Sequence, residues 1–429
     1  MKRGTKQIWG VAVALVLGAC GDDSSPAGTE GETEMAGSTA ATSVATTEAA
    51  DSTGEPTPGT DVDSSDDGVD STGTDGGGAE LMGSCEGVTL PPRPADTAQR
   101  GPWEVGARTV DLDGLTVEVW YPAAPGSEAG VDPVVYDVRE FLPESEQGLI
   151  PDEDNPWQNC DCYRDVPIDG DNGPYPVILF VHGTAGFRTQ SLPQMEHWAS
   201  RGFVVMAADH PGLYMADLLG IACGAGMVPQ DLQGDLGIML SAVRGEIPGL
   251  EDLGDRIDST RIATSGHSAG GNAVSGTGTD AQVIIPMAAG GVEDGPVVES
   301  SLVLGALADS VVAFSSQTAG YDATPPRKRL VGIANTGHLA FSGLCSLSND
   351  SGDNIVEIAQ AYDVCGTVFA GALFQCDDSF VPDPEGWEII NFASSAVLEE
   401  TLHCEPEAAA ELSLIQGRYP VVLDFREEL

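Results

Sequence analysis

The feature that most constrains this chain is a run of small residues around one serine. Residues 261–273 read Arg-Ile-Ala-Thr-Ser-Gly-His-Ser-Ala-Gly-Gly-Asn-Ala, with the G-x-S-x-G pattern Gly266-His267-Ser268-Ala269-Gly270 at the centre. A serine becomes a useful nucleophile when it projects from a sharp strand-to-helix turn, where the positions two before and two after it must be nearly bare. Strand-like residues precede Ser268, and the small residues after it suit a helix that packs closely on a sheet. The run therefore predicts a nucleophile elbow at Ser268.

The first 84 residues have a composition that cannot form a core. Lys2, Arg3 and Lys6 precede an apolar run over residues 8–17, as in a secretory signal too short to span a membrane. Leu17-Gly18-Ala19-Cys20 resembles the lipobox of bacterial lipoproteins, in which the cysteine receives lipid; an ordinary signal peptide is the alternative. Residues 21–84 are mainly Ser, Thr, Gly, Ala, Asp and Glu, with no Lys or Arg and almost no large apolar side chain, which predicts a disordered tether.

These features predict an exported protein, anchored through Cys20 to the membrane of the bacterial cell envelope, with one globular domain over residues 85–429. We expect that domain to be a monomer. The chain has 67 acidic and 18 basic side chains, a formal charge of −49. Such a charge argues against nucleic acid or anionic lipid headgroups as partners, because both repel an acidic surface.

The cysteines indicate an oxidised protein. With Cys20 set aside for lipid, eight cysteines remain, and an even set in an exported chain predicts disulfides. We expect Cys160 and Cys162 to pair with distant partners, since a single intervening residue would make a strained ring. A zinc site is the alternative, but no second close pair of Cys or His residues supports it.

Alternating strand and helix patterns predict the fold class. Residues 109–122 contain two alternating runs around Asp113-Gly114, which is typical of an antiparallel hairpin. Residues 123–174 are rich in Pro, Asp and Gly, and we interpret them as a long surface excursion. Buried strands are expected at 176–181, 203–208, 258–264, 283–288, 301–308 and 329–335, and helices at 194–201 and 230–244. The order predicts a mainly parallel central sheet with an antiparallel N-terminal hairpin and helices on both faces.

A serine nucleophile on such a sheet needs an acid and a histidine, which follow it in that order along the chain. His338 and His403 are the histidines that follow Ser268. His338 comes directly after a strand-like run and is our choice as the base, whereas His403 lies in a helix-like segment and is interpreted as a surface or packing residue. His182, His210 and His267 are interpreted as structural hydrogen-bonding residues.

The acid has two candidates. Asp309 ends the strand-like run 301–308, and a carboxylate there would orient the imidazole of His338; Asp294, after the preceding strand, is the alternative. The oxyanion of the reaction needs two backbone donors. We expect the amide of Ala269, next to the nucleophile, and the amide of Thr184, in the loop after the strand 176–181.

Four short stretches between residues 117 and 347 match the sequence landmarks of a known family. They are Val119-Trp120-Tyr121-Pro122, His182-Gly183 followed by Phe187-Arg188-Thr189, Arg201-Gly202-Phe203-Val204-Val205, and Gly266 to Gly271. On these the chain resembles the α/β-hydrolase superfamily, and within it the platelet-activating-factor acetylhydrolases and the bacterial cutinase-like polyester hydrolases. The resemblance implies that Thr184 and Ala269 donate to the oxyanion. The acetylhydrolase acid follows the strand after the elbow helix, but residues 286–291 hold no carboxylate. The acid at Asp309 is placed as in cutinase-like and dienelactone-hydrolase-like enzymes.

The function predicted from these residues is a serine carboxylic-ester hydrolase that works through a Ser-His-Asp triad and an acyl-enzyme. Short-to-medium acyl esters, lipid-like or polyester-like, are the expected substrates, and no metal or organic cofactor is required. One alternative is an amidase or peptidase with the same triad. The other is a surface binding or adhesion protein without enzymatic activity, built on an esterase fold.

Overall fold

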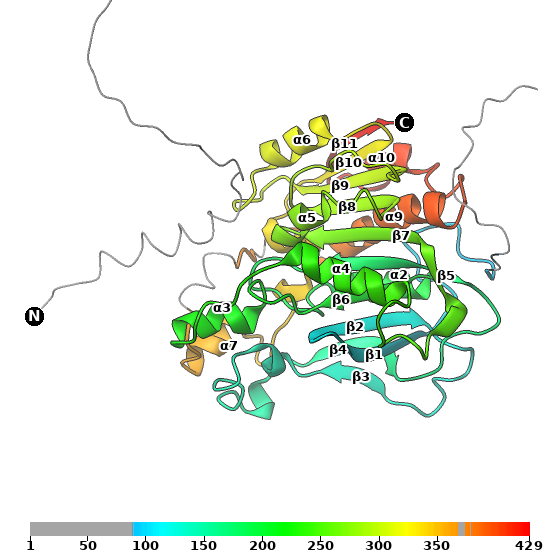
Figure 1. Ribbon diagram of the computed structural model, residues 1–429. Helices are drawn as coiled ribbons and strands as arrows, with labels where there is room; N and C mark the ends of the chain where they lie inside the picture. The colour runs from blue at the N-terminus through cyan, green and yellow to red at the C-terminus, as the bar shows by residue number, and fades with distance from the viewer. Residues whose placement is uncertain (1–87, 89, 368–373, 378) are drawn as a thin grey trace, which may run out of the picture. The chain divides into compact units, whose positions relative to one another are not determined.

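The computed structural model describes residues 88, 90–367, 374–377 and 379–429. The expectations for the signal segment 1–20, the lipid-bearing Cys20 and the tether 21–84 fall outside these residues. Within the described residues the chain forms one sheet, in the order β11-β10-β9-β8-β7-β5-β6-β2-β1-β4-β3 (Figure 1). Its strands are β1 (Val105–Leu112), β2 (Leu115–Pro122), β3 (Pro133–Tyr136), β4 (Gln158–Arg164), β5 (Tyr175–Val181), β6 (Val204–Ala208), β7 (Ile257–His267), β8 (Val283–Met287), β9 (Ser300–Ala306), β10 (Lys328–Ile333) and β11 (Val422–Glu428).

The centre of the sheet is parallel and its flanks are largely antiparallel. Strands β5 to β10 pair in parallel, and β11 closes one side antiparallel to β10. On the other side β1 and β2 form an antiparallel hairpin in which Leu112 faces Leu115 across Asp113-Gly114. The two turn residues have positive φ, 53° and 89°, as a tight hairpin of this kind requires. The predicted fold class, an α/β-hydrolase sheet with an N-terminal hairpin, is confirmed.

Residues 123–174 differ from the expected surface excursion, because part of the segment joins the sheet as β3 and β4. In β4 the side chains of Gln158, Cys160 and Cys162 are buried, and those between them are exposed. This is strand periodicity, but the inward residues are a glutamine and two cysteines rather than large apolar side chains. The composition of the segment therefore concealed its alternation.

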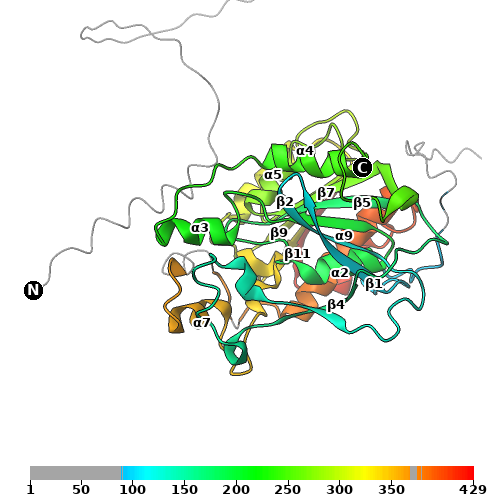
Figure 2. The same ribbon diagram turned by 60° about the horizontal axis from the view of Figure 1, so that its bottom comes forward.

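The two faces of the sheet carry separate hydrophobic cores, because successive side chains of a strand point to opposite faces. In β5, Ile178 and Phe180 lie in one core, and Val177 and Leu179 lie in the other. Helices α2 and α9 cover the first face, and α4 and α5 cover the second (Figure 2). The helices are α2 (Leu192–Ser200), α3 (Met215–Ala222), α4 (Leu232–Val243), α5 (Ala269–Val274), α6 (Phe314–Ala323), α7 (Ile355–Ala361), α9 (Asp383–Leu402) and α10 (Ile415–Arg418). No helix in the described part of the chain has the length and apolarity to cross a membrane.

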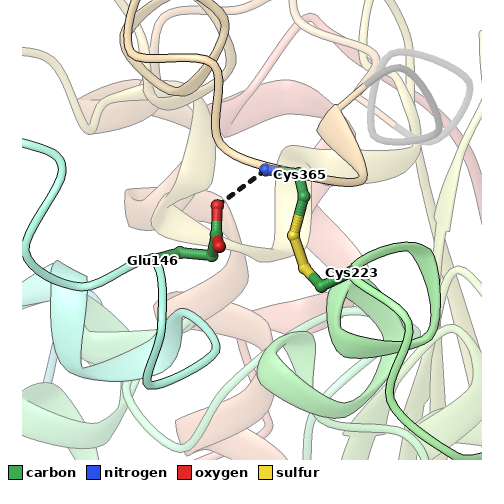
Figure 3. A group of neighbouring side chains, drawn as sticks. All are labelled: Glu146, Cys223 and Cys365. Carbon is green, nitrogen blue, oxygen red and sulfur yellow. Dashed lines mark hydrogen bonds between the residues drawn. A yellow bond between two sulfur atoms is a disulfide. The ribbon is translucent and has the colours of Figure 1, made fainter.

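Helices α3 and α7 lie side by side at the edge where the parallel strands end (Figures 1 and 2). Leu219 of α3 and Ile358 of α7 belong to one small apolar cluster. A disulfide joins Cys223, which follows α3, to Cys365, which follows α7 (Figure 3). Glu146 accepts a hydrogen bond from the backbone amide of Cys365 at 3.0 Å, so a third segment is fastened to the same point.

Disulfides occupy all of the described cysteines, as the even count predicted. Besides Cys223–Cys365, bonds join Cys345 to Cys376 and Cys160 to Cys162, and Cys404 is also disulfide-bonded. The expectation that Cys160 and Cys162 have distant partners was wrong. Both side chains lie on the same face of β4, and their Cα atoms are 5.1 Å apart, within the span that a disulfide bridges.

Candidate active site

The candidate nucleophile lies on a strained turn between β7 and α5. Ser268 has φ 57° and ψ −118°, a conformation that costs energy in a residue with a Cβ atom. Its amide donates to the carbonyl of Met287 in the next strand at 2.8 Å. A Cβ atom on Gly266 would lie 2.5 Å from the backbone of Gly270, so the chain cannot double back this tightly with a larger residue. The turn has the geometry expected of a nucleophile elbow.

The hydroxyl of Ser268 is hydrogen-bonded to His338, and His338 to Asp309. His338 Nε2 lies 2.9 Å from Ser268 Oγ, and His338 Nδ1 lies 2.8 Å from Asp309 Oδ2. An ionised carboxylate only accepts hydrogen bonds, so Nδ1 carries the hydrogen and the lone pair of Nε2 is directed at the hydroxyl. The side chains of His338 and Asp309 are 4 % and 0 % exposed, which shields this chain of hydrogen bonds from water.

Asp309 lies after β9, on the edge where the parallel strands end. Its Oδ1 accepts from the amides of Val311 and Val312 at 2.8 Å each, and Oδ2 also accepts from Gln317 Nε2 at 3.1 Å. These donors compensate the buried charge and fix the direction of the second oxygen toward the imidazole. The alternative acid, Asp294, is exposed. The structure therefore brings Asp309 to His338, and leaves Asp294 at the surface.

The other histidines make structural contacts. His403 stacks on Phe203, with ring centroids 4.3 Å apart, and burial holds its pKa well below the usual value. His182 Nδ1 bonds to the carbonyl of Gly183 at 2.8 Å, and its Nε2 accepts from the amide of His210 at 3.1 Å. Burial lowers the pKa of His182 to about 3, so this ring is neutral at physiological pH.

The two candidate oxyanion donors lie on either side of the serine. Ala269 is the first residue of α5, and Thr184 lies in the loop after β5. Among the hydrogen bonds between described residues, none uses either amide, whereas their neighbour Ala185 donates to Leu213 at 3.0 Å. Unpaired amides beside a nucleophile are available to a developing negative charge.

A small cavity of about 20 Å³ adjoins Ser268 and His338, and Thr184, Leu339 and Leu344 help to line it. A cavity of this size holds about one water molecule. The apolar part of its wall comes from the two 3-10 turns that follow β10, η4 (His338–Phe341) and η5 (Gly343–Cys345). An acyl group that reaches the serine must therefore fit against, or displace, these two leucines.

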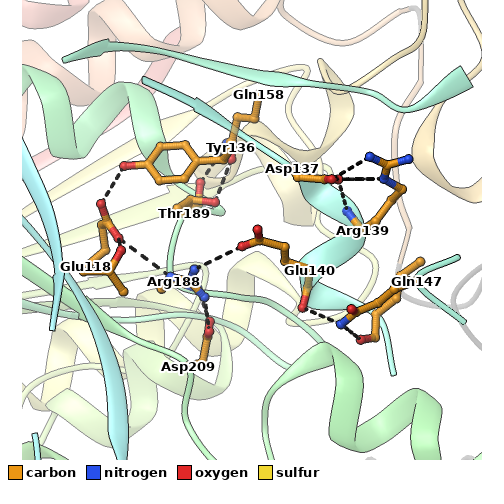
Figure 4. Close-up of polar contacts among 12 residues, drawn as sticks. Glu118, Tyr136, Asp137, Arg139, Glu140, Gln147, Gln158, Arg188, Thr189 and Asp209 are labelled. Atoms are coloured by element: carbon orange, nitrogen blue, oxygen red, sulfur yellow. Dashed lines mark hydrogen bonds and ion pairs between the residues drawn. The ribbon is translucent and has the colours of Figure 1, made fainter. Parts of the chain in front are cut away.

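A buried arginine holds the loop that carries Thr184 (Figure 4). The amide of Arg188 donates to Asp209 Oδ1 at 2.8 Å, and its guanidinium forms an ion pair with the same carboxylate. Glu118 and Glu140 lie within 3.9 Å and 3.8 Å of the guanidinium. Arg188 entered the sequence reasoning as a family landmark, but its role as an anchor has no local signal, because its partners come from three other segments.

His267 and Gln190 connect the elbow to the two neighbouring loops. His267 Nε2 bonds to the backbone carbonyl of His338 at 2.8 Å, and Gln190 Nε2 lies 3.3 Å from His267 Nδ1. Gln190 Oε1 accepts from the amide of Gly183 at 3.3 Å. Burial first, and then the nearby His338, lower the pKa of His267 to about 3. A neutral His267 donates to the carbonyl and accepts from Gln190, a residue that sequence reasoning missed.

Comparison with known proteins identifies one family in part of the chain. Residues 156–212 match the family model of platelet-activating factor acetylhydrolase, isoform II. No curated protein matches the chain. The matched segment runs from the start of β4 through the Thr184 loop to the residues after β6, and ends before Ser268, Asp309 and His338. Together with the α/β-hydrolase fold, the match supports a serine hydrolase acting on esters as the general activity of this chain.

Proposed function

We propose that this chain is a serine carboxylic-ester hydrolase in which Ser268 is the nucleophile, His338 the general base and acid, and Asp309 the residue that orients His338. The observation that carries the proposal is the continuous line of hydrogen bonds from a fully buried carboxylate through an imidazole to the hydroxyl of a strained serine. Nucleophile, base and orienting group in hydrogen-bond contact are the elements that acyl transfer requires.

The reaction follows from this order. Ser268 Oγ attacks the ester carbonyl while His338 Nε2 takes its proton, and the amides of Thr184 and Ala269 stabilise the oxyanion. His338 then protonates the leaving alcohol, and an acyl-enzyme remains on Ser268. Water attacks this acyl group while His338 takes its proton. The bond between the acyl carbon and Ser268 Oγ then breaks, His338 returns the proton to Oγ, and the carboxylic acid departs. Asp309 stabilises the positive charge of the imidazolium in both halves of the reaction.

Short-to-medium acyl esters, lipid-like or polyester-like, are the proposed substrates; the cavity next to Ser268 is small and Leu339 and Leu344 form an apolar part of its lining. Turnover of p-nitrophenyl esters of increasing acyl length tests this assignment, and a rate that rises steadily to long chains would contradict it. A matched set of p-nitroanilide amides separates esterase from amidase or peptidase activity.

Substitution of the nucleophile tests the mechanism. Ser268→Ala should lower the turnover of p-nitrophenyl butyrate by at least about 10⁴-fold and abolish covalent labelling by a fluorophosphonate probe, because no other group replaces the hydroxyl. The matched control is Ser265→Ala, which removes another buried serine hydroxyl from β7, one that donates to the carbonyl of Ile285 at 2.9 Å. It should keep both turnover and labelling.

The same experiment separates an enzyme from a binding protein on an esterase fold. A folded wild-type protein that neither labels nor hydrolyses any ester would support the binding protein and end this proposal.

Export and lipid anchoring belong to the proposal as well, since Cys20 ends a lipobox-like sequence. Incorporation of an alkyne-labelled fatty acid by cells that express the full chain is the direct measurement. Cys20→Ala should abolish the label and release the protein from the membrane fraction.

A further inference from the structure

One side chain outside the catalytic set bonds to the loops of both the acid and the base. Gln375 Oε1 accepts from the amide of His338 at 2.9 Å and from the amide of Ser310 at 3.2 Å. Its Nε2 donates to the carbonyl of Ala308 at 3.0 Å. Ala308 and Ser310 are the two chain neighbours of Asp309, so a single carboxamide contacts the base and both sides of the acid.

The segment that carries Gln375 is fastened close to the base. Cys376, the next residue, is disulfide-bonded to Cys345 at the end of η5, seven residues after His338. Further along the segment, the amide of Val381 donates to the carbonyl of Asn335 at 2.7 Å. The disulfide and this hydrogen bond therefore hold Gln375 on the loop that it contacts.

Gly337 allows the segment to come this close. A Cβ atom at position 337 would lie 2.5 Å from the ring of Phe380 and 3.0 Å from the carboxamide of Gln375. A larger residue at position 337 would therefore push the segment that carries Gln375 away from the backbone amide of His338.

We propose that Gln375 is a positioning residue that sets the separation of Asp309 and His338. The inference rests on the proposed function. The acid and base lie on loops that leave two different strands, β9 and β10, and beyond the strand ends the sheet no longer determines their spacing. The amide of Ala308 also donates to the carbonyl of Thr336 at 3.0 Å, and Gln375 adds three bonds that join the same two loops.

The expected kinetic signature is a loss of kcat at nearly constant KM. Gln375 is not among the residues that line the cavity beside Ser268, so we expect its replacement to leave KM nearly unchanged. Its removal lets the imidazole drift from the carboxylate and the hydroxyl, and small displacements of reacting groups lower rates by one to two orders of magnitude.

Two substitutions separate hydrogen bonding from packing. Gln375→Met keeps the length of the side chain but loses all three hydrogen bonds, and kcat should fall about 10-fold or more. Gln375→Glu keeps the oxygen that accepts from His338 and Ser310, but its second carboxylate oxygen faces the carbonyl oxygen of Ala308, so its kcat should also fall below that of wild type. A role in folding alone predicts no loss of kcat per labelled active site in either variant.

The control is Gln282, which also forms hydrogen bonds to backbone groups through its carboxamide, but lies just before β8, where the parallel strands begin. Its Oε1 accepts from the amide of Ile262 at 2.8 Å, and its Nε2 donates to the carbonyl of Thr260. Gln282→Met should keep the wild-type kcat. The double substitution Cys345→Ser with Cys376→Ser frees the segment that carries Gln375, and should reproduce the kcat loss of Gln375→Met even where the protein stays folded.

All variants are assayed with p-nitrophenyl butyrate, with kcat expressed per site labelled by a fluorophosphonate probe. This normalisation removes any loss caused by unfolded protein. Wild-type kcat in labelled Gln375→Met, or an equal loss in Gln282→Met, would overturn the inference while leaving the proposed function in place. A wild-type protein that neither labels nor turns over the ester would remove both.

Discussion

The two halves of the candidate site are held by different means. Ser268 lies at the end of a central strand, and its position follows from glycine backbones packed against neighbouring strands. His338 and Asp309 lie on loops, and their positions follow from side chains that come from elsewhere, among them Gln317, Gln375 and His267. Ser268 is thus placed by the packing of the core, whereas His338 and Asp309 are placed by hydrogen bonds from side chains around the core.

This contrast explains why a short motif marks one half and not the other. Close backbone packing requires glycine two residues before and two residues after Ser268. A motif of five consecutive residues, Gly266 to Gly270, therefore marks this part of the site in the sequence. A loop can be held by any well-placed hydrogen-bonding side chain. Gln317, which donates to Asp309, lies 8 residues from it, and Gln375, which accepts from the amide of His338, lies 37 residues from that histidine. The following predictions test the contrast, from the largest effect to the smallest.

The largest effect is expected on the loop side. Asp309→Asn should lower kcat/KM for p-nitrophenyl butyrate by about 10⁴-fold, because a neutral amide can donate to Nδ1 and so favour the wrong tautomer of His338. The protein should still fold, since the amides of Val311 and Val312 retain an oxygen partner and Gln317 keeps its hydrogen bond to the carbonyl of Val312. The comparison variant is Asp294→Asn, whose side chain is exposed and should be silent. A greater loss at Asp294 would reverse the assignment of the acid.

On the core side, Gly270→Ala should impair both stability and rate. The added Cβ atom would overlap the carbonyl oxygen of Val181 and lie 2.5 Å from that of His182, so the elbow helix and the Thr184 loop must separate. We expect a loss of about 1–3 kcal/mol in the free energy of unfolding and about 100-fold in kcat. Urea unfolding and steady-state kinetics measure the two quantities.

The control for crowding is Gly237→Ala. Gly237 is an exposed residue of α4 with no atom within 4 Å of an added Cβ, and alanine there should stabilise the helix by up to about 1 kcal/mol. Normal kcat in Gly270→Ala would show that the elbow tolerates movement, and the contrast between the two halves would fail.

The smallest effect on rate is expected at His197, a buried residue of α2 outside the candidate site. Burial, and then Arg201, lower the pKa of His197 to about 3, and its Nε2 bonds to the carbonyl of Thr97 at 2.9 Å. The unfolded chain takes up a proton below about pH 6.5 that the folded chain refuses until about pH 3. This contribution to stability is therefore complete above pH 6.5 and is lost progressively as the pH falls below it.

His197→Gln keeps a donor to Thr97 and removes the titration. Between pH 7.5 and 5 the variant should lose about 2 kcal/mol less unfolding free energy than wild type, with kcat at pH 7.5 unchanged. Equal losses in both proteins would show that this histidine is not kept neutral by the fold.

The sequence predicted what local patterns encode. The run of strands and helices gave the fold class, because parallel strands buried on both faces are continuous apolar segments such as residues 176–181. Each of Ser268, Asp309 and His338 was predicted to follow a parallel strand. The structure brings the three side chains together at that edge of the sheet.

The remainder depends on contacts between distant segments. β4 was missed because its buried residues are Gln158, Cys160 and Cys162, and the pairing of these two cysteines follows only once the segment is known to be a strand. Arg188 and Gln375 meet partners that only the folded chain brings near. No spacing in the sequence indicates such contacts.

The bond between Cys223 and Cys365 encloses the elbow, the acid and the base within one covalent loop of the chain. A protease that cuts a single peptide bond between these cysteines opens the backbone without separating the two fragments. The cleaved protein should migrate as one band on a denaturing gel until a reductant is added, so a cut in the loops around Ser268 leaves the two fragments covalently joined.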